Sequence, residues 1–223
     1  MFPTTESQRI LNSLPLHHDG KIGFVVYRVA YGDDERWAQF LKHLDAHVQA
    51  GCEGDKHSSK LKEAFEWDIR QDEAKLKDAS KNEIRRMFKE WIRSVKGSGK
   101  LARYQVCIYA DDEVINSVIE DESPGDEDYE LVDRPRAFVK LLHRSFEETP
   151  HQFTPQQVPD AEERERMSAG DEGYPPIEGC KRRDVGWMKS SIKWLVPVTY
   201  AYMEGGGWDL LYTRPPKMSA GGG

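Results

Sequence analysis

The feature that most constrains the fold is a pattern that occurs twice: an apolar run, two aspartates and a stretch with helical spacing. Residues 22–31 are rich in β-branched and aromatic side chains, and Asp33 and Asp34 follow them. Residues 104–109 lead in the same way to Asp111 and Asp112. Because each run precedes apolar residues at helical spacing, the pattern predicts a strand followed by a helix. A repeated strand–helix unit is typical of an α/β fold.

The whole chain therefore predicts one α/β domain, with a mixed or mainly parallel central sheet flanked by helices. We expect strands over 22–31, 64–69, 104–109, 192–203 and 208–212, the last two forming a closing C-terminal hairpin. We expect helices over 33–49, 80–96, 112–119 and 136–146, and Ser80 and Glu83 have the spacing of a capping box. The domain then comprises 22–146 and 182–216, with an irregular lead-in over 1–21, a long loop or lid over 147–181 and a flexible tail over 217–223.

Charge is distributed unevenly along the chain. The net charge is -7, but residues 111–133 hold eleven acids and neither Lys nor Arg. Residues 81–103 instead carry eight bases against two acids. Such runs are usually solvated faces of helices and loops. The alternative interpretation is an anion-binding helix beside an acidic pocket that holds a cation.

Three observations bear on the compartment. The longest run without charged residues, histidine or glycine, 194–203, is ten residues long, about half of the roughly 20 that a membrane-spanning helix needs. Charged residues and histidines interrupt any apolar segment near the N-terminus, so no signal peptide is visible. The three cysteines are far apart and include no Cys-x-x-Cys motif. We therefore expect a cytoplasmic protein with no membrane partner.

The two aspartate pairs are candidate functional residues. In open α/β sheets, ligands bind beyond the carboxyl ends of the strands, and parallel strands would bring both pairs to one rim. A carboxylate cluster there can hold a guanidinium, an ammonium or a metal ion, or keep one acid protonated for general acid–base chemistry. The same residues are also favoured helix N-caps, which needs no function.

Five segments carry a resemblance to known proteins. They are Gly23-Phe-Val-Val-Tyr-Arg28, Tyr31-Gly-Asp-Asp34 with Trp37, Arg86-Met-Phe-Lys-Glu-Trp91, Cys107-Ile-Tyr-Ala-Asp-Asp112 and Gly186-Trp-Met188. Over most of its length the chain resembles a widespread set of filamentous-fungal proteins and, through them, the arginine-containing cyclodipeptide synthases. This resemblance implies an enzyme of secondary metabolism that joins arginine to a second amino acid, using aminoacyl-tRNA. It carries over no catalytic motif position by position.

The leading hypothesis is thus an aminoacyl-tRNA-dependent cyclodipeptide synthase that forms a cyclo-arginine-Xaa diketopiperazine. Its partners would be arginyl-tRNA and a second aminoacyl-tRNA, and it would need no metal or organic cofactor because the ester bond already activates the amino acid. The candidate residues fall into three groups. The catalytic candidates are Asp111, Asp112, Glu113 and Tyr109; the substrate-binding candidates are Asp33, Asp34, Tyr27, Tyr31 and Trp187; the tRNA-binding candidates are Arg85, Arg86, Lys89 and Arg93.

Two alternatives belong to other classes. One is a noncatalytic interaction protein whose acidic stretch docks a basic partner and whose segment 147–181 orders on binding. The other is a metal-dependent enzyme that uses the paired aspartates. The sequence gives neither the second amino acid, nor a nucleophile, nor the oligomeric state.

Overall fold

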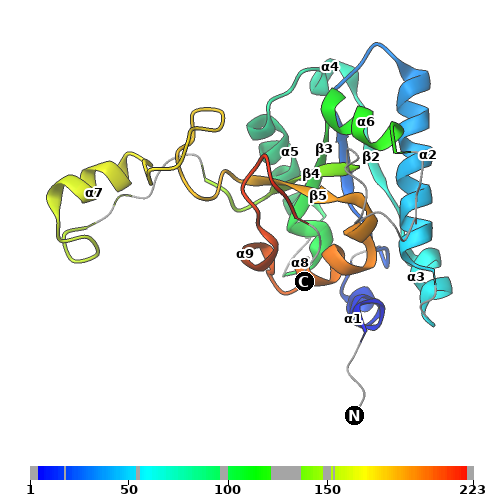
Figure 1. Cartoon of the computed structure of the whole chain (residues 1–223). Coiled ribbons are helices and arrows are strands. Elements are labelled where there is room, and N and C mark those ends of the chain that lie inside the picture. Colours follow the sequence, from blue (N-terminus) through cyan, green and yellow to red (C-terminus); the bar gives the residue numbers. More distant parts are fainter. Residues whose placement is uncertain are drawn as a thin grey trace.

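A computed structural model shows an α/β domain in which helices cover both faces of one sheet (Figure 1). The structure describes residues 5–17, 19–53, 56–95, 100–121, 137–147, 152 and 154–219. The sheet has six strands in the order β2-β1-β3-β4-β5-β6. The predicted fold class, with a mixed central sheet, is confirmed.

The sheet is built from a parallel half and an antiparallel half. Its strands are β1 (Val25–Arg28), β2 (Asp68–Arg70), β3 (Val106–Ala110), β4 (Phe138–His143), β5 (Trp187–Ser191) and β6 (Met218–Ser219). β1 pairs in parallel with β2 and with β3, whereas β4 runs antiparallel to both β3 and β5. β6 adds a short parallel edge to β5. The carboxyl ends of β1 and β3 therefore meet at one end of the sheet, as the sequence predicts.

Two apolar layers hold the helices to the sheet. On one face, α2 (Asp34–Gly51) and α6 (Asp112–Ile119) bury Trp37, Phe40 and Val114 against β1, β3 and β4. On the other face, α5 (Lys81–Ser94) buries Ile84 and Phe88. Burying one such side chain contributes roughly 1.5–3 kcal/mol, so these two stripes fix where each helix lies. The three helices lie where the sequence predicts them, and the predicted capping box at Ser80 is present.

Smaller elements complete the domain. They are α1 (Glu6–Ser13), α3 (Ser58–Ala64), α4 (Glu73–Leu76), α7 (Ala161–Ser168), α8 (Tyr200–Met203), α9 (Trp208–Leu211) and short 3-10 turns at Leu14–Leu16, Ala102–Tyr104 and Ile192–Trp194. The predicted irregular lead-in is wrong in part, because α1 lies in it and buries Ile10 in the core. The expected strand over 64–69 begins only at Asp68, since Ala64 ends α3.

The predicted helix over 136–146 is wrong, because Phe138–His143 forms β4. This strand is central, with a partner on each side, and its first five residues are buried. A strand covered on both faces reads as a continuous apolar run, which periodicity cannot distinguish from a short buried helix.

The predicted strand over 192–203 and the hairpin to 208–212 are also wrong. The chain there forms a 3-10 turn, a kinked turn at Leu195–Thr199, α8 and α9. From Ile192 to Tyr200 the buried residues of this segment follow one another at steps of three and one. The buried residues are Ile192, Leu195, Val196, Thr199, Tyr200, Ala201 and Met203. That spacing is helical. Ile192, Val196 and Tyr200 also fit the every-second-residue pattern that predicts a strand, so the two patterns share every fourth residue.

Of the predicted loop or lid over 147–181, residues 154–181 extend from the body as an arm that carries α7 (Figure 1). None of the residues of α7 is buried. At its base, Arg214 donates hydrogen bonds to the carbonyl oxygens of Pro175 and Arg182, at 2.7 and 3.1 Å. Of the expected tail over 217–223, Met218 and Ser219 belong to β6, and 220–223 lie outside the described residues. Within the described chain, every helix is too short or too polar to cross a membrane.

Candidate functional site: an acidic rim and a lysine cluster

A row of polar side chains crosses the sheet on the face that α5 covers. Tyr27 on β1 is in register with Tyr109 on β3, Tyr109 with Lys140 on β4, and Lys140 with Lys189 on β5. Residues in register across neighbouring strands point to the same face of a sheet. Asp111, two residues beyond Tyr109, joins this face at the end of β3. The sheet register thus builds one site from four strands.

Lys140 lies at the centre of this site. Its Nζ is 2.5 Å from Oδ2 of Asp111 and 2.5 Å from Oε2 of Glu113, and only 5% of its side chain is exposed. The same Asp111 caps α6, accepting a hydrogen bond from the Val114 amide at 3.1 Å through its other oxygen. Both oxygens of Asp111 are therefore occupied, and Lys140 places a positive charge between this carboxylate and that of Glu113.

Glu113 also forms an ion pair with Lys189, on the neighbouring strand. Burial raises the pKa of Glu113, but hydrogen bonds from Lys140 and Lys189 outweigh it and hold the pKa below its usual value. Half of the Glu113 side chain (51%) nevertheless remains exposed. We call Lys140, Lys189, Asp111 and Glu113 the lysine cluster. It presents a fixed, partly open carboxylate to solvent.

The acidic rim, defined here as Asp33, Asp34, Asp111, Asp112 and Glu113, forms as the sequence predicts. Asp33 caps α2 through the Arg36 amide at 2.8 Å. Arg36 reaches across to α6, where its Nη1 is 2.9 Å from Oδ1 of Asp112. This contact ties the starts of the two helices together. Asp112 keeps 72% of its side chain exposed, so the rim is accessible on that side.

Buried Arg28 supports the other end of the rim. Its Nη1 is 2.8 Å from Oδ1 of Asp34, and its Nε donates to the Ala30 carbonyl at 2.9 Å. The guanidinium lies over the rings of Tyr31, at 4.5 Å, and Trp37, at 5.1 Å. Such stacking with a charge pair orients a guanidinium firmly. Asp34 is thus held in place while 91% of its side chain faces solvent.

The three candidate tyrosines keep their protons at neutral pH. Burial raises the pKa of Tyr109 to about 12, and its hydroxyl donates to the Ala79 carbonyl at 2.9 Å. Burial likewise raises the pKa of Tyr27 and Tyr31. The Tyr31 hydroxyl is buried and has no hydrogen-bond partner among the described residues. Tyr27 and Tyr109 are buried in the layer beneath α5, where they shape the site.

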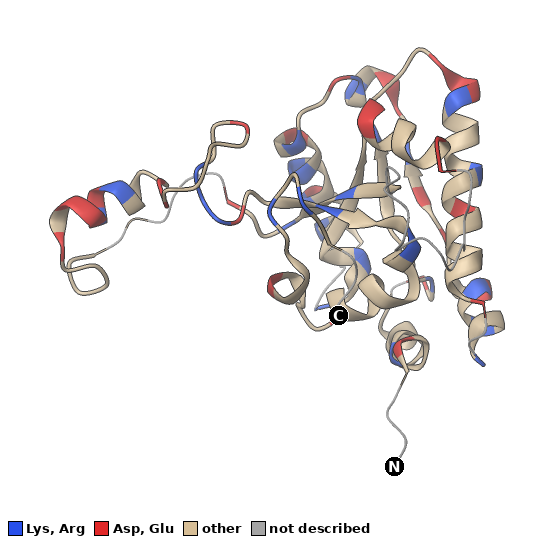
Figure 2. Ribbon diagram, in the orientation of Figure 1, with Lys and Arg blue, Asp and Glu red and all other residues tan. Residues whose placement is uncertain are grey.

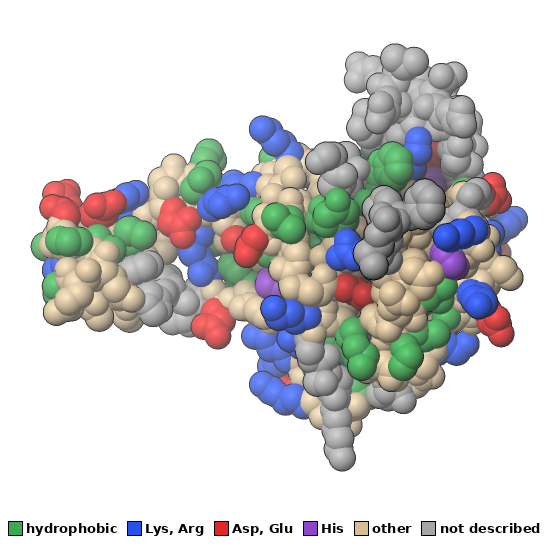
Figure 3. Space-filling view, turned by 90° about the horizontal axis from the view of Figure 1, so that it is seen from below, with side chains coloured by type: hydrophobic (Ala, Val, Ile, Leu, Met, Phe, Trp, Pro, Cys, Tyr) green, Lys and Arg blue, Asp and Glu red, His purple; other side chains and the backbone are tan. Residues whose placement is uncertain are grey.

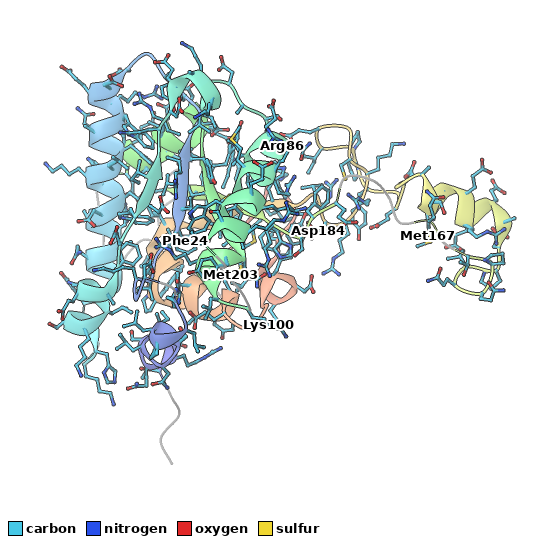
Figure 4. The ribbon with its side chains drawn as sticks, turned by 180° about the vertical axis from the view of Figure 1, so that it is seen from behind. Phe24, Arg86, Lys100, Met167, Asp184 and Met203 are labelled. Atoms are coloured by element: carbon cyan, nitrogen blue, oxygen red, sulfur yellow. The ribbon has the colours of Figure 1, made fainter. Side chains whose placement is uncertain are left out.

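The four basic candidates on α5 differ in exposure. The prediction that Arg85 lies on an exposed basic surface is wrong: it is only 4% exposed and donates to the carbonyls of His143, at 2.9 Å, and Gly186, at 3.1 Å. It lies on the stripe of α5 that faces the sheet. Arg86 and Arg93 are exposed and Lys89 is half-buried. In the view from behind, α5 lies in front of the sheet and bears Arg86 (Figure 4).

Trp187 connects the lysine cluster to the base of α5. Its ring is buried, with Nζ of Lys140 at 5.7 Å from the ring centroid and Nζ of Lys81 at 4.7 Å. Lys81 in turn pairs with Glu178 of the arm. The sequence alone does not identify Lys140, Lys189, Lys81 or Glu178 as site residues. Only the register of β4 and β5 could have revealed the first two, and those strands were not predicted.

Arginine and lysine side chains of the domain hold the rim carboxylates in place, and Asp34, Asp112 and Glu113 each keep a solvent-exposed part. Such an arrangement can receive a guanidinium or ammonium group. Among the described residues, no three His, Cys, Asp or Glu side chains converge as a metal site requires. The most acidic part of the chain, 122–133, lies outside the described residues. Comparisons with models of protein families, with curated proteins and with solved structures gave no match.

Proposed function

We propose that this protein is a cytoplasmic, aminoacyl-tRNA-dependent cyclodipeptide synthase that makes a cyclo-arginine-Xaa diketopiperazine. One observation carries the proposal: a rim of exposed carboxylates lies at the carboxyl ends of β1 and β3, and α5, which covers one face of the same sheet, bears exposed cations. Arginyl-tRNA has a cationic amino acid attached to a polyanion, so a protein that binds it needs both kinds of surface. The resemblance of the five sequence segments to the arginine-containing cyclodipeptide synthases agrees with it.

The rim is suited to the amino acid. Asp112 and Glu113 offer exposed carboxylate faces to a guanidinium or ammonium, and Asp34 offers a third. The lysine cluster fixes Glu113, so binding would require little reorganisation of that side chain. Tyr27 and Tyr109 do not release protons at neutral pH, so we assign them to positioning.

Three basic side chains of α5, two exposed and one half-buried, are suited to the tRNA. Arg86, Lys89 and Arg93 would contact phosphates, and such contacts position a nucleic acid without reading its sequence. Figure 2 shows Asp and Glu at the starts of α2 and α6, and α5 with Lys and Arg among a few acidic residues. The acidic rim and the basic residues of α5 correspond to the two ends of the proposed substrate.

The reaction balances without an oxidant or a cofactor. The amine of one aminoacyl group attacks the ester carbon of the other, the ester C–O bond breaks, and one tRNA leaves with a proton on its terminal ribose oxygen. The dipeptidyl amine then attacks the remaining ester carbon, closing the six-membered ring and releasing the second tRNA. The protein's share is to orient two esters and to accept the ammonium protons, for which the rim carboxylates are the nearest bases.

The test is small-molecule mass spectrometry on a host that expresses the chain, compared with an empty vector. We expect a new arginine-containing diketopiperazine. The double variant Asp111→Asn, Asp112→Asn should abolish it, since asparagine still caps α6 but carries no charge. Glu163→Gln on the arm is the matched control and should retain the product. If product and arginine preference both survive in the folded double variant, the rim is not the binding site.

A noncatalytic interaction protein is the second candidate, and the arm favours it. α7 carries Glu162, Glu163, Glu165 and three further polar residues with none buried, so its charged surface is available to a partner. Met167 marks its place, far from the body (Figure 4). A chain lacking 154–168 that still makes the diketopiperazine would show that the arm is not catalytic. Loss of all product from folded wild-type protein supplied with charged tRNA would favour the interaction protein.

A further inference from the structure

A cavity of about 320 Å³ lies at the β2 edge of the sheet, on the face that α5 covers. Its walls come from β1, from β2 and the residues that follow it, from α4 and from α5. Arg70 on β2 is in register with Tyr27 on β1, so the cavity lies at the outer end of the row of polar side chains that runs to Lys189. Ligand cavities range from about 300 to 1,000 Å³, so this one suits a single ring system.

Tyr27 lines this cavity, and its hydroxyl has no hydrogen-bond partner within the described part of the chain. The residue is only 4% exposed, and its ring packs edge-on against Phe88. Tyr109, its neighbour in register, instead donates to the Ala79 carbonyl at 2.9 Å. Burial raises the pKa of Tyr27, so its hydroxyl keeps the proton and can donate it to an acceptor. Because buried polar groups need a partner, the partner of this hydroxyl has to come from the cavity.

Two further side chains of the cavity keep an unused N–H donor. Oε1 of Gln71 accepts a hydrogen bond from the indole of Trp37 at 2.9 Å. An indole can only donate, so this contact fixes the orientation of the amide and leaves Nε2 as a donor. Nε and Nη2 of Arg70 face the two oxygens of Asp68 at 2.7 and 2.8 Å, and its Nη1 has no partner among the described residues. The cavity therefore offers donors and calls for a ligand with acceptor atoms.

The charges in and beside the cavity are already balanced within the protein. Three cations meet three carboxylates there, and none of the distances exceeds 3.8 Å. The pairs are Arg70 with Asp68, Lys75 with Asp72, and Arg103, which meets both Asp68 and Asp19. A charged ligand would have to compete with these ion pairs, whereas a neutral one leaves them intact.

The remaining walls are apolar and include an aromatic ring. Trp91 is half-buried, and the guanidinium carbon of Arg70 lies 5.6 Å from the centroid of its ring. Flat ligands stack on tryptophan rings, and the sulfur of methionine contacts aromatic rings favourably. The apolar lining residues are Ile69, Leu76, Met87 and Trp91. Such walls favour a planar ring.

We infer that this cavity binds a neutral, planar heteroaromatic ring with hydrogen-bond acceptors, the chemistry of a nucleobase. Trp91 and Met87 supply contacts to the ring, and Tyr27 and Gln71 supply donors to its acceptor atoms. The ring belongs either to a free nucleoside or to an unpaired base of an RNA. The second source would give the proposed function another contact with tRNA, but the cavity is argued from its own lining and does not depend on that function.

The test is calorimetric titration of the full-length protein with three probes: adenosine, N-methylindole and a single-stranded RNA that ends in CCA. Adenosine and N-methylindole contain fused rings of similar size, but only adenosine carries acceptor nitrogens. Tyr27→Phe should weaken adenosine binding about fivefold, the loss of one neutral hydrogen bond, and leave N-methylindole binding unchanged. Gln71→Glu keeps the acceptor for Trp37 and removes the amide donor, so it should weaken adenosine binding as well.

Two controls separate a binding role from a structural one. Because the Tyr27 hydroxyl has no partner among the described residues, Tyr27→Phe should unfold at the same temperature as the wild type. Tyr174→Phe is the matched substitution away from the cavity, because Tyr174 is exposed and belongs to the arm that projects from the body (Figure 3). It should bind all three probes like the wild type.

The outcomes separate the two sources and the two proposals. RNA that binds more tightly than adenosine, with the same dependence on Tyr27, identifies an unpaired RNA base, and equal or weaker RNA binding identifies a nucleoside. Binding without diketopiperazine synthesis would leave the ring site standing and remove the proposed function. The ring site is overturned, even if the protein makes a diketopiperazine, if neither adenosine nor the RNA binds. It is also overturned if folded Tyr27→Phe and Gln71→Glu bind adenosine like the wild type, or if Tyr27→Phe weakens N-methylindole as much as adenosine.

Discussion

Replacing Lys140 by methionine tests whether the lysine cluster organises the rim. Methionine is similar in length and apolar, so the substitution removes the charge and leaves the packing against Trp187 largely intact. Asp111 and Glu113 then remain as two carboxylates that Lys140 no longer separates. Breaking a buried ion pair costs about 3–5 kcal/mol. Because 25% of the Asp111 side chain and 51% of the Glu113 side chain reach water, we expect about 2–3 kcal/mol at pH 7.

The pH dependence gives this prediction its sign. In the wild type, Lys140 and Lys189 hold the pKa of Glu113 below its unfolded value, so Glu113 stabilises the fold above about pH 4.3 and this contribution disappears as pH falls through the folded pKa. In the Lys140→Met variant, much of this lowering of the Glu113 pKa is lost. The difference in unfolding free energy between wild type and variant should therefore be larger at pH 7 than at pH 4, and it should become small only below the folded pKa of Glu113.

Urea unfolding of both proteins at pH 7 and pH 4, followed by circular dichroism, measures this difference. Lys77→Met is the matched control: Lys77 pairs with Glu73 on the surface, and its replacement should leave the midpoint unchanged at both pH values. The reasoning is refuted if Lys140→Met is as stable as the wild type at pH 7, or if its loss of stability is equal at the two pH values.

Three further predictions concern the neighbouring structure. Gly186→Ala should cost about 2–4 kcal/mol, because the site combines a positive φ with a collision of the new Cβ against Phe146. Gly205→Ala should cost only about 1 kcal/mol, since Gly205 has a similar φ but no atom within 4 Å of the new Cβ. Thermal unfolding compares the two variants, and equal losses of stability would contradict the collision. Arg85→Met should cost about 2–4 kcal/mol by leaving two carbonyls without their donor, against at most about 0.5 kcal/mol for exposed Arg86→Met in the same urea assay. Burial lowers the pKa of His143 to about 4, so the stability of the fold should fall as pH drops from 6.5 toward 4. An NMR titration of His143 with a midpoint near 6.5 would be inconsistent with the burial of its ring against Trp208.

The parallel half of the fold and the acidic rim were predictable from the sequence because their signals are local. In each strand–helix unit, an aspartate marks the point where the strand ends and the amphipathic helix begins. Asp33 and Asp111 do cap the helices that they precede. Parallel pairing of β1 and β3 then brings the two acid pairs together. That step follows from the fold class alone.

The rest depends on pairings between distant segments. The sequence predicts a helix in place of β4 because this strand is apolar on both faces. Lys140 is its one charged residue before His143. Lys140 meets Asp111 only through the register of β3 with β4. Arg85 and Arg182, almost a hundred residues apart, likewise lie over the same Phe146 ring. No local pattern records such contacts.

The most direct test of the proposed function is a reaction with purified components. The protein is mixed with tRNA charged with isotope-labelled arginine and with a pool of other aminoacyl-tRNAs, and the products are analysed by mass spectrometry. We predict a labelled arginine-containing diketopiperazine, release of arginine from its tRNA faster than by spontaneous hydrolysis, and loss of both with the Asp111→Asn, Asp112→Asn variant. Discharge of arginyl-tRNA at the spontaneous rate, with no labelled diketopiperazine from folded protein, would contradict the proposal.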